Sequence, residues 1–209
     1  MFLSLGSNLG NRAQYLQHAL FLLHHEVGEV VKVSPLYESP AWGFSSEPFY
    51  NICAELHTDL PLEALLPRLH AIEARLGRVR TSQPSEGYKA RTLDIDILYY
   101  DDKVVQTDTL CVPHPQLALR RFVLQPLADI APNFVDPTKG QTISQLLDAC
   151  PDITSLTLVE QDFALPVNKT AIPYRYITIE GNIGAGKTSL ATRLAEDFSG
   201  QLLLEEFAT

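Results

Sequence analysis

The sequence predicts an α+β protein, in which helices pack on an antiparallel sheet to form a two-layer sandwich. Apolar residues recur at helical spacing in some stretches and alternate as in strands in others. These stretches follow one another twice in the order strand, helix, strand. The character of the chain then changes near residue 174, where a fragment of a second, α/β domain is expected to begin.

The first half of the chain contains the clearest elements. Residues 2–5 predict a strand, and the apolar residues from Leu16 to Leu23 follow the spacing of a helix with one buried face. β-Branched residues at 30–33 predict a strand within residues 27–37. The elements expected next are a loop at 39–48, a strand at 52–56, a helix from Pro61 to Gly77, a polar loop at 81–89 and a strand at 93–100.

The later elements are shorter. A turn at 101–102 and a return strand at 104–105 are expected, followed by a partly helical stretch at 117–127. A short helix at 143–147 and a strand at 156–159 complete the first domain. We expect this domain to span residues 1–160, a linker to span residues 161–173, and an incomplete P-loop domain to span residues 174–209.

Composition limits the classes of function. With 209 residues, 45% hydrophobic and 20% charged, the chain has room for one medium domain and a fragment. A net charge of -9 argues against a large nucleic-acid surface. Cys53, Cys111 and Cys150 form neither a zinc pattern nor a disulfide framework, and no signal peptide or membrane span is visible. We therefore expect a cytoplasmic protein without nucleic-acid or membrane partners.

The segment from Arg78 to Tyr100 carries the strongest chemical signal. Alternation in a strand puts Leu93, Ile95, Ile97 and Tyr99 on one face and both Asp94 and Asp96 on the other, about 7 Å apart. Two neighbouring carboxylates suit Mg²⁺, which completes its shell with water and phosphate oxygens. The basic residues just before them fit phosphoryl-type transfer; they are Arg78, Arg80, Lys89 and Arg91. The alternative is a polar strand face beside a solvated basic loop.

Several motifs occur in a fixed order along residues 1–160: LGSNLGNR, SPLYESPAWG, PFYN, GRVR, ARTLDIDIL, and VPHP followed by RRFVLQPL. Together they resemble the 6-hydroxymethyl-7,8-dihydropterin pyrophosphokinase family. The resemblance implies a ferredoxin-like fold and a transferase of folate biosynthesis. Its members move the β,γ-pyrophosphoryl group of ATP to the pterin hydroxymethyl oxygen and release AMP, with two Mg²⁺ ions that Asp94 and Asp96 would hold here.

The resemblance also assigns roles to individual residues. It implies catalytic roles for Arg78, Arg91, Asp94 and Asp96. The implied pterin site consists of Ser39, Pro40, Trp42, Phe49, Asn51 and Phe122, and the implied ATP site of His70, Glu73, Arg80, Tyr88, Ile97, His114 and Arg120. From the residues alone, core packing is an alternative for Phe49 and Phe122, and a strand-edge position is an alternative for Asn51.

A second motif begins at Gly181. A phosphate-binding P-loop has the pattern glycine, four residues, glycine, lysine and threonine, placed between a strand and a helix. This chain has that pattern at Gly181, Gly186, Lys187 and Thr188, after an expected strand at 174–179 and before an expected helix. The segments EGNIGAGKTSL and LLLEEF resemble those of deoxynucleoside kinases. The resemblance implies that Glu205 or Glu206 would act as the base here. The roughly 36 residues, ending in an expected strand at 202–204, are too few for a P-loop domain, so we expect the start of a second domain of a bifunctional parent.

Three functions compete at this point. The first is a pterin pyrophosphokinase that uses ATP and 6-hydroxymethyl-7,8-dihydropterin. The second is an ATP-dependent deoxynucleoside kinase with a non-catalytic N-terminal domain, and the third is a binding module without turnover. AMP as the product would identify the first function, and ADP the second. The carboxylate pair argues against the third function, because a pure binding module has no need of two metal ligands.

Overall fold

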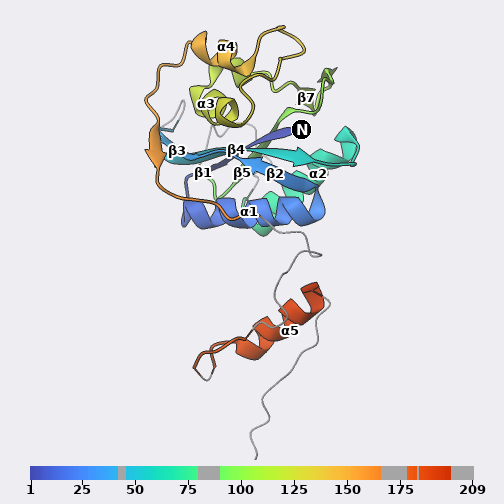
Figure 1. The fold of residues 1–209 in the computed structure, drawn as a ribbon, viewed down its shortest axis with the longest axis vertical. Coiled ribbons are helices and arrows are strands. Elements are labelled where there is room, and N and C mark those ends of the chain that lie inside the picture. The colour runs from blue at the N-terminus through green and yellow to red at the C-terminus, as the bar shows by residue number, and fades with distance from the viewer. Residues whose placement is uncertain (42–45, 80–89, 166–177, 183, 199–209) are drawn as a thin grey trace, which may run out of the picture. The chain divides into compact units, whose positions relative to one another are not determined.

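The computed structural model describes residues 1–41, 46–79, 90–165, 178–182 and 184–198. It divides the chain into two compact units, Met1–Pro166 and Val167–Thr209. The first unit contains the sheet and the helices that cover it, and the second contains α5 (Figure 1). No helix among the described residues is long and apolar enough to cross a membrane.

The first unit is built on a six-stranded antiparallel sheet in the order β5-β1-β4-β3-β8, with β2 also paired to β4. Its strands are β1 (Phe2–Ser7), β2 (Glu29–Val33), β3 (Leu36–Ser39), β4 (Phe49–His57), β5 (Asp94–Tyr99) and β8 (Thr157–Val159). β4 pairs antiparallel with both β1 and β2, so these two strands are parallel to each other and β4 lies between them. β1, α1 and β2 thus form one strand–helix–strand unit. β1 lies in the same way between β4 and β5, so the ferredoxin-like arrangement is confirmed.

The single strand expected within residues 27–37 is two strands in the structure. β2 ends at Val33 and β3 begins at Leu36, so Ser34 and Pro35 separate them. Proline has no N–H to give to a sheet, and the hydroxyl of Ser34 accepts a 2.9 Å hydrogen bond from the backbone N–H of Cys53 on β4. The break between β2 and β3 therefore lies where the Ser34 side chain, and not a backbone carbonyl, accepts the hydrogen bond from β4. A separate two-stranded ribbon consists of β6 (Val105–Gln106) and β7 (Cys111–Val112).

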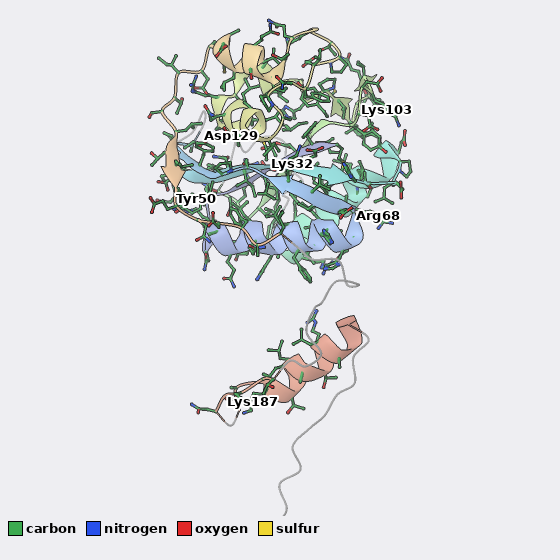
Figure 2. All side chains as sticks on the ribbon, viewed as in Figure 1. Lys32, Tyr50, Arg68, Lys103, Asp129 and Lys187 are labelled. Atoms are coloured by element: carbon green, nitrogen blue, oxygen red, sulfur yellow. The ribbon has the colours of Figure 1, made fainter. Side chains whose placement is uncertain are left out.

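Helices cover both faces of the sheet. α1 (Arg12–Glu26) and α2 (Leu62–Arg75) lie on one face, and α3 (Arg121–Ile130) and α4 (Ile143–Asp148) lie on the other (Figure 1). A short 3₁₀ turn, Leu117–Leu119, precedes α3. Side chains fill the space on both sides of the sheet, in two separate apolar clusters (Figure 2). The expected two-layer sandwich describes the sheet with α1 and α2, and α3 and α4 add a third layer.

The end of β5 differs from strict alternation. The pairing of β1 with β5 shifts register, since Leu3 pairs with Ile97 whereas Phe2 pairs with Tyr99. Leu98 and Tyr99 consequently both belong to the cluster under α3 and α4, whereas Ile97 belongs to the cluster under α1 and α2. The prediction that Tyr99 shares a face with Ile97 was wrong, because a bulge inserts one residue and reverses the side-chain direction.

Residues 160–165 belong to the first unit. Phe163 packs against the apolar cluster beneath α1 and α2. The backbone N–H of Ala164 donates to Oε1 of Gln17 and its carbonyl accepts from Nε2 of Gln17, each at 2.9 Å. We call residues 160–165 the strap. The compact unit therefore extends beyond residue 160 to Pro166, since the strap is held on α1.

The second unit contains α5 (Lys187–Phe198), which confirms the expected helix. Gly184 and Gly186 have φ of 83° and 76°, the left-handed backbone that a tight turn before a helix requires. Nζ of Lys187 donates to the carbonyls of Gly181 and Asn182 at 2.5 and 2.8 Å. Most of the expected strand 174–179, the strand 202–204, Glu205 and Glu206 lie outside the described residues.

Candidate active site

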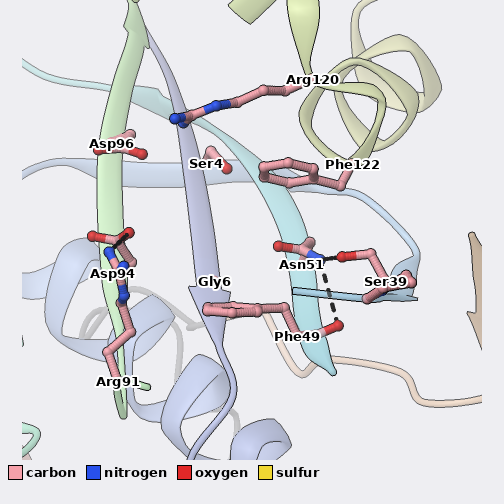
Figure 3. A pocket seen from close by; sticks show the side chains of 11 residues that line it. Ser4, Gly6, Ser39, Phe49, Asn51, Arg91, Asp94, Asp96, Arg120 and Phe122 are labelled. Atoms are coloured by element: carbon pink, nitrogen blue, oxygen red, sulfur yellow. Dashed lines mark hydrogen bonds and ion pairs between the residues drawn. The ribbon is translucent and has the colours of Figure 1, made fainter. Parts of the chain in front are cut away.

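One pocket opens over the sheet beneath the start of α3, and 11 residues line it (Figure 3). Nine of them were predicted from the sequence as site residues: Ser39, Pro40, Phe49, Asn51, Arg91, Asp94, Asp96, Arg120 and Phe122. The fold thus collects residues from positions 39 to 122 into one cavity. The two groups of residues predicted to bind metal and pterin form its two ends.

The middle of the pocket is formed by β1. Gly6 pairs with Asn51 of β4 on one side and with Asp94 of β5 on the other. A Cβ atom at Gly6 would lie 3.4 Å from Oδ1 of Asn51 and 3.6 Å from the ring of Phe49, so the glycine keeps this part of the pocket open. Ser4, which pairs with Asp96, lines the same face.

The first end of the pocket is aromatic and amide-lined. Phe49 from β4 and Phe122 from α3 lie on opposite sides of the space beside Asn51 (Figure 3). Nδ2 of Asn51 donates a 2.9 Å hydrogen bond to Oγ of Ser39, and both residues are buried. Together with a 3.4 Å hydrogen bond from Nδ2 to the carbonyl of Phe49, this bond fixes the orientation of the amide. The arrangement suits a flat ring that stacks on aromatic faces and hydrogen-bonds at its edge.

The second end of the pocket contains carboxylates and arginines. Oδ2 of Asp94 accepts a 2.5 Å hydrogen bond from Arg91, and Oδ1 accepts one from Arg78. Burial, followed by the nearby charge of Asp94, raises the pKa of Asp96 to about 6, and Arg120 opposes this rise. A cation between the two carboxylates would relieve this repulsion, so the residues present fit a divalent metal ion.

The metal would rely on few protein ligands. No group of three or more histidine, cysteine or acidic side chains within the described ranges could hold a metal ion. Mg²⁺ commonly takes one or two carboxylates and completes its shell with water and substrate phosphates. Asp94 and Asp96 therefore fit a site that is completed by a triphosphate and water.

Glu73 lies next to the charged end of the pocket without lining it, and its contact with ATP stays a prediction. It is wholly buried, and its Oε1 accepts a 2.9 Å hydrogen bond from the backbone N–H of Ile95 and one from Arg78. Burial acts to lower the pKa of Arg78, but Asp94 and Glu73 raise it overall. Glu73 lies behind Asp94 and outside the pocket lining, so the geometry gives it the task of orienting Arg78 and β5.

Of the other residues predicted to bind ATP, Arg120 lines the pocket, and the described residues Ile97, His70 and His114 do not. Ile97 packs in the cluster beneath α1 and α2, on the opposite face of β5 from Asp96, and its contact with ATP stays a prediction. His70 lies partly buried on α2. Trp42, Arg80 and Tyr88 fall outside the described residues.

His114 lies close to the pocket without lining it. Its backbone N–H donates to the carbonyl of Leu98 at 3.1 Å, next to the end of β5. Burial, and then the charge of Arg120, lowers the pKa of His114 to about 4. Nδ1 accepts a 3.2 Å hydrogen bond from the backbone N–H of Gln116, so the neutral ring carries its proton on Nε2.

Ser4 and Gly6 were not predicted as site residues. They alternate with Leu3 and Leu5 along β1, and the polar and small residues face the pocket while both leucines are buried beneath the sheet. That alternation is visible in the sequence. It does not reveal that β1 lies between β4 and β5, which is what brings Gly6 to the centre of the pocket.

Comparison with known proteins identifies the family. Residues 2–132 match the family model described as 7,8-dihydro-6-hydroxymethylpterin-pyrophosphokinase (HPPK). A Synechocystis protein named 2-amino-4-hydroxy-6-hydroxymethyldihydropteridine pyrophosphokinase is 41% identical over 145 residues, which cover 69% of this chain and 72% of that protein. A Porphyromonas gingivalis protein of the same name is 42% identical over 134 residues, covering 63% of this chain and 90% of that protein.

Longer proteins also contain a similar part. The chain is 37% identical over 153 residues to the Pneumocystis carinii folic acid synthesis protein fol1. The matched residues are 73% of this chain but only 20% of that protein. The crystal structure of wild-type Plasmodium falciparum HPPK-DHPS with SDX-DHP has a similar fold, with a TM-score of 0.58 at 16% identity, over 71% of this chain and 43% of that one. The chain belongs to the 7,8-dihydro-6-hydroxymethylpterin-pyrophosphokinase family.

Proposed function

We propose that the pocket transfers the β,γ-pyrophosphoryl group of ATP to the hydroxymethyl oxygen of 6-hydroxymethyl-7,8-dihydropterin, giving the pterin diphosphate and AMP for folate biosynthesis. The observation that carries this proposal is the meeting of an aromatic, amide-lined end and a carboxylate–arginine end in one cavity. A flat acceptor and a polyphosphate donor would be held side by side across Gly6, which gives the proximity that a group transfer needs.

The acceptor is held by the aromatic end. The pterin ring would stack between Phe49 and Phe122, and the amide of Asn51 would pair with its pyrimidine-like edge. Because Nδ2 of Asn51 donates to Oγ of Ser39 and, at 3.4 Å, to the carbonyl of Phe49, the orientation of the amide is set before the ligand arrives. This preorganisation favours one face and one edge of the ring.

The donor is held by the charged end. Asp94 and Asp96 would hold magnesium, for which we propose two ions, and bound magnesium would neutralise charge on the triphosphate during transfer. Arg91 and Arg120 line the same end and are suited to bind the negative oxygens of the transferred group. Arg78 supports Asp94 from behind, and the neutral His114 ring offers an N–H donor close by.

Catalysis in this proposal relies on positioning and charge. The lining residues that the structure describes include no histidine or lysine that could act as a strong base. The arginines would stabilise charge that develops on the migrating group, and the stacked pterin would present its hydroxymethyl oxygen in line with it.

A product assay tests the proposal. The protein is incubated with ATP, Mg²⁺ and 6-hydroxymethyl-7,8-dihydropterin, and nucleotides are separated by chromatography. AMP that depends on the pterin is the expected result. ADP in place of AMP, or no pterin-dependent turnover from a folded protein that binds ATP, would contradict it.

For the second unit we propose the start of a P-loop domain similar to deoxynucleoside kinases, within a bifunctional cytoplasmic parent. The support is local: glycines at positive φ precede α5, and Lys187 begins that helix. We propose that the linker lies within residues 167–173, after the strap, in place of the residues 161–173 expected from the sequence. Lys187→Ala should leave pterin-dependent AMP formation unchanged, and a nucleoside kinase activity that depends on Lys187 is expected only from the longer parent.

A further inference from the structure

Asn8 lies between the two chain segments that lead into the two ends of the pocket. It follows β1 directly and is 2% exposed. β1 runs antiparallel to β4 and β5 and lies between them, so its last residues lie beside the first residues of both neighbours. Those first residues are Phe49 of β4 and Asp94 of β5, one from each end of the pocket.

The side chain of Asn8 makes hydrogen bonds to the segment before β4 and to the segment before β5. Its Nδ2 donates to Oγ of Ser46 at 2.9 Å and to the carbonyl of Glu47 at 3.1 Å, just before β4. Its Oδ1 accepts a 2.7 Å hydrogen bond from the backbone N–H of Arg91, and its own backbone N–H donates to the carbonyl of Arg91 at 3.1 Å. A single buried amide thus joins segments 38 to 83 residues away in sequence.

Each of these partners leads directly to a pocket residue. Glu47 is two residues before Phe49, the aromatic residue proposed to stack on the acceptor. Arg91 lines the charged end and donates to Asp94. A displacement at Asn8 would therefore move the acceptor side and the phosphate side relative to each other.

We infer that Asn8 is a positioning residue that keeps the acceptor end and the phosphate end of the pocket in register; this inference rests on the proposed function. An amide is the side chain that meets the requirement, because it donates from one terminal atom and accepts at the other. Aspartate would keep the acceptor for Arg91 and lose the donor for Ser46 and Glu47.

Loss of the amide should shift the pocket without unfolding the protein. Arg12 holds the same stretch of chain independently: its Nη1 donates to the carbonyl of Pro48 at 2.8 Å and to Oε1 of Glu38 at 2.7 Å. The guanidinium also lies 3.6 Å from the centre of the Tyr50 ring. The start of β4 therefore stays attached when Asn8 is replaced.

A matched control lies three residues further on. Asn11 is the N-cap of α1 and accepts a 3.2 Å hydrogen bond from the backbone N–H of Gln14. Asn11→Ala removes an asparagine side chain from the same segment and weakens a helix end, but it breaks no bond to the pocket. The Asn11→Ala variant therefore measures how much the loss of a helix cap alone changes kcat and KM.

The test measures kcat, both KM values and the melting temperature for the wild type, Asn8→Ala, Asn8→Asp and Asn11→Ala. Asn8→Ala should lower kcat/KM roughly a hundredfold, the scale of a misplacement near 1 Å, and should raise the KM for the pterin. Asn8→Asp should recover kcat relative to Asn8→Ala while its pterin KM stays high. Asn11→Ala should retain wild-type kinetics.

The outcomes separate the inference from the function on which it rests. A wild-type protein without pterin-dependent AMP formation would overturn the proposed function. With an active wild type, equal kinetic losses in Asn8→Ala and Asn11→Ala would overturn the inference alone. An Asn8→Asp variant with no better kcat than Asn8→Ala would also overturn it, because the bond to Arg91 would then have no separate effect.

Discussion

Nδ2 of Asn51 donates a 2.9 Å hydrogen bond to Oγ of Ser39, which joins β4 to β3 at the aromatic end of the pocket. Both side chains are almost fully buried, at 3% and 2% exposed. The bond leaves the amide with one defined orientation toward the pocket. Recognition of a ring edge therefore depends on a pair of residues, in which Ser39 orients the amide of Asn51 that would meet the ligand edge.

This pair can be tested by two substitutions. Asn51→Asp replaces an amide donor by a carboxylate and should raise the KM for the pterin by one to two orders of magnitude, roughly the 1–3 kcal/mol of an unpaired buried group. Ser39→Ala should have a smaller effect of the same kind, because it frees the amide to rotate. Steady-state kinetics with the pterin varied measures both, and an unchanged KM in Asn51→Asp would remove Asn51 from the acceptor site.

The carboxylate pair predicts a loss of metal-dependent turnover. Asp96→Asn should lower kcat roughly a hundredfold or more, because metal stabilisation of transferred charge amounts to several kcal/mol. The matched control is Asp102→Asn, an exposed aspartate in the turn after β5. Turnover is measured as a function of Mg²⁺ concentration. Equal effects of the two substitutions would show that Asp96 is no metal ligand.

Gly6 predicts a graded steric effect. Gly6→Ala places a methyl group in ordinary contact with Asn51 and Phe49 and should be tolerated with a modest rise in pterin KM. Gly6→Val should nearly abolish pterin binding, since a branched side chain in a close-packed site overlaps its neighbours. Pterin affinity is measured by isothermal calorimetry, with circular dichroism to confirm folding. Tight binding by a folded Gly6→Val protein would place the ligand elsewhere.

Tyr99 and Asp136 predict a pH dependence of stability. The hydroxyl of Tyr99 donates to Oδ2 of Asp136 at 2.8 Å. Burial acts to raise the pKa of Asp136, but hydrogen bonds from Thr138, Tyr99 and two backbone N–H groups lower it overall. Because the folded pKa lies below the unfolded one, this stabilisation is complete above the unfolded value and is lost as the pH falls through the folded one.

Tyr99→Phe should consequently lower the free energy of unfolding by about 1–2 kcal/mol at neutral pH, and the difference from the wild type should shrink below about pH 4. Urea unfolding at pH 7 and at pH 3.5 measures the two differences. Tyr37→Phe is a suitable comparison, because its hydroxyl bonds to Asp129 at an exposed site. A difference for Tyr99→Phe that grows in acid would contradict the assignment.

The strap predicts where the first unit can be shortened. A chain ending at Glu160 loses the packing of Phe163 and the two bonds between Ala164 and Gln17, whereas a chain ending at Pro166 keeps them. The shorter chain should melt several degrees lower, since a loss near 1 kcal/mol shifts the melting temperature by roughly 2–4 °C for a unit of this size. Both chains are compared by calorimetry. Identical melting curves would mean that the strap contributes no stability.

Local sequence determined much of this protein. The alternation in β5 was sufficient to put Asp94 and Asp96 on one face, and helical spacing was sufficient for α1 and α2. These features depend on neighbours within one turn or two strand positions, so periodicity reveals them. The ordered motifs then led to the family, which added six more residues of the pocket: Ser39, Pro40, Phe49, Asn51, Arg120 and Phe122.

The tertiary structure decided what depends on distant pairing. Only the strand order puts Gly6 between Asn51 and Asp94, and only the bulge in the pairing of β1 with β5 moves Tyr99 to the opposite core. Glu73 became a partner of Arg78 because α2 packs against β5 at that point. Such contacts join residues far apart in the chain, and no local periodicity carries that information because register and packing arise only when the sheet assembles.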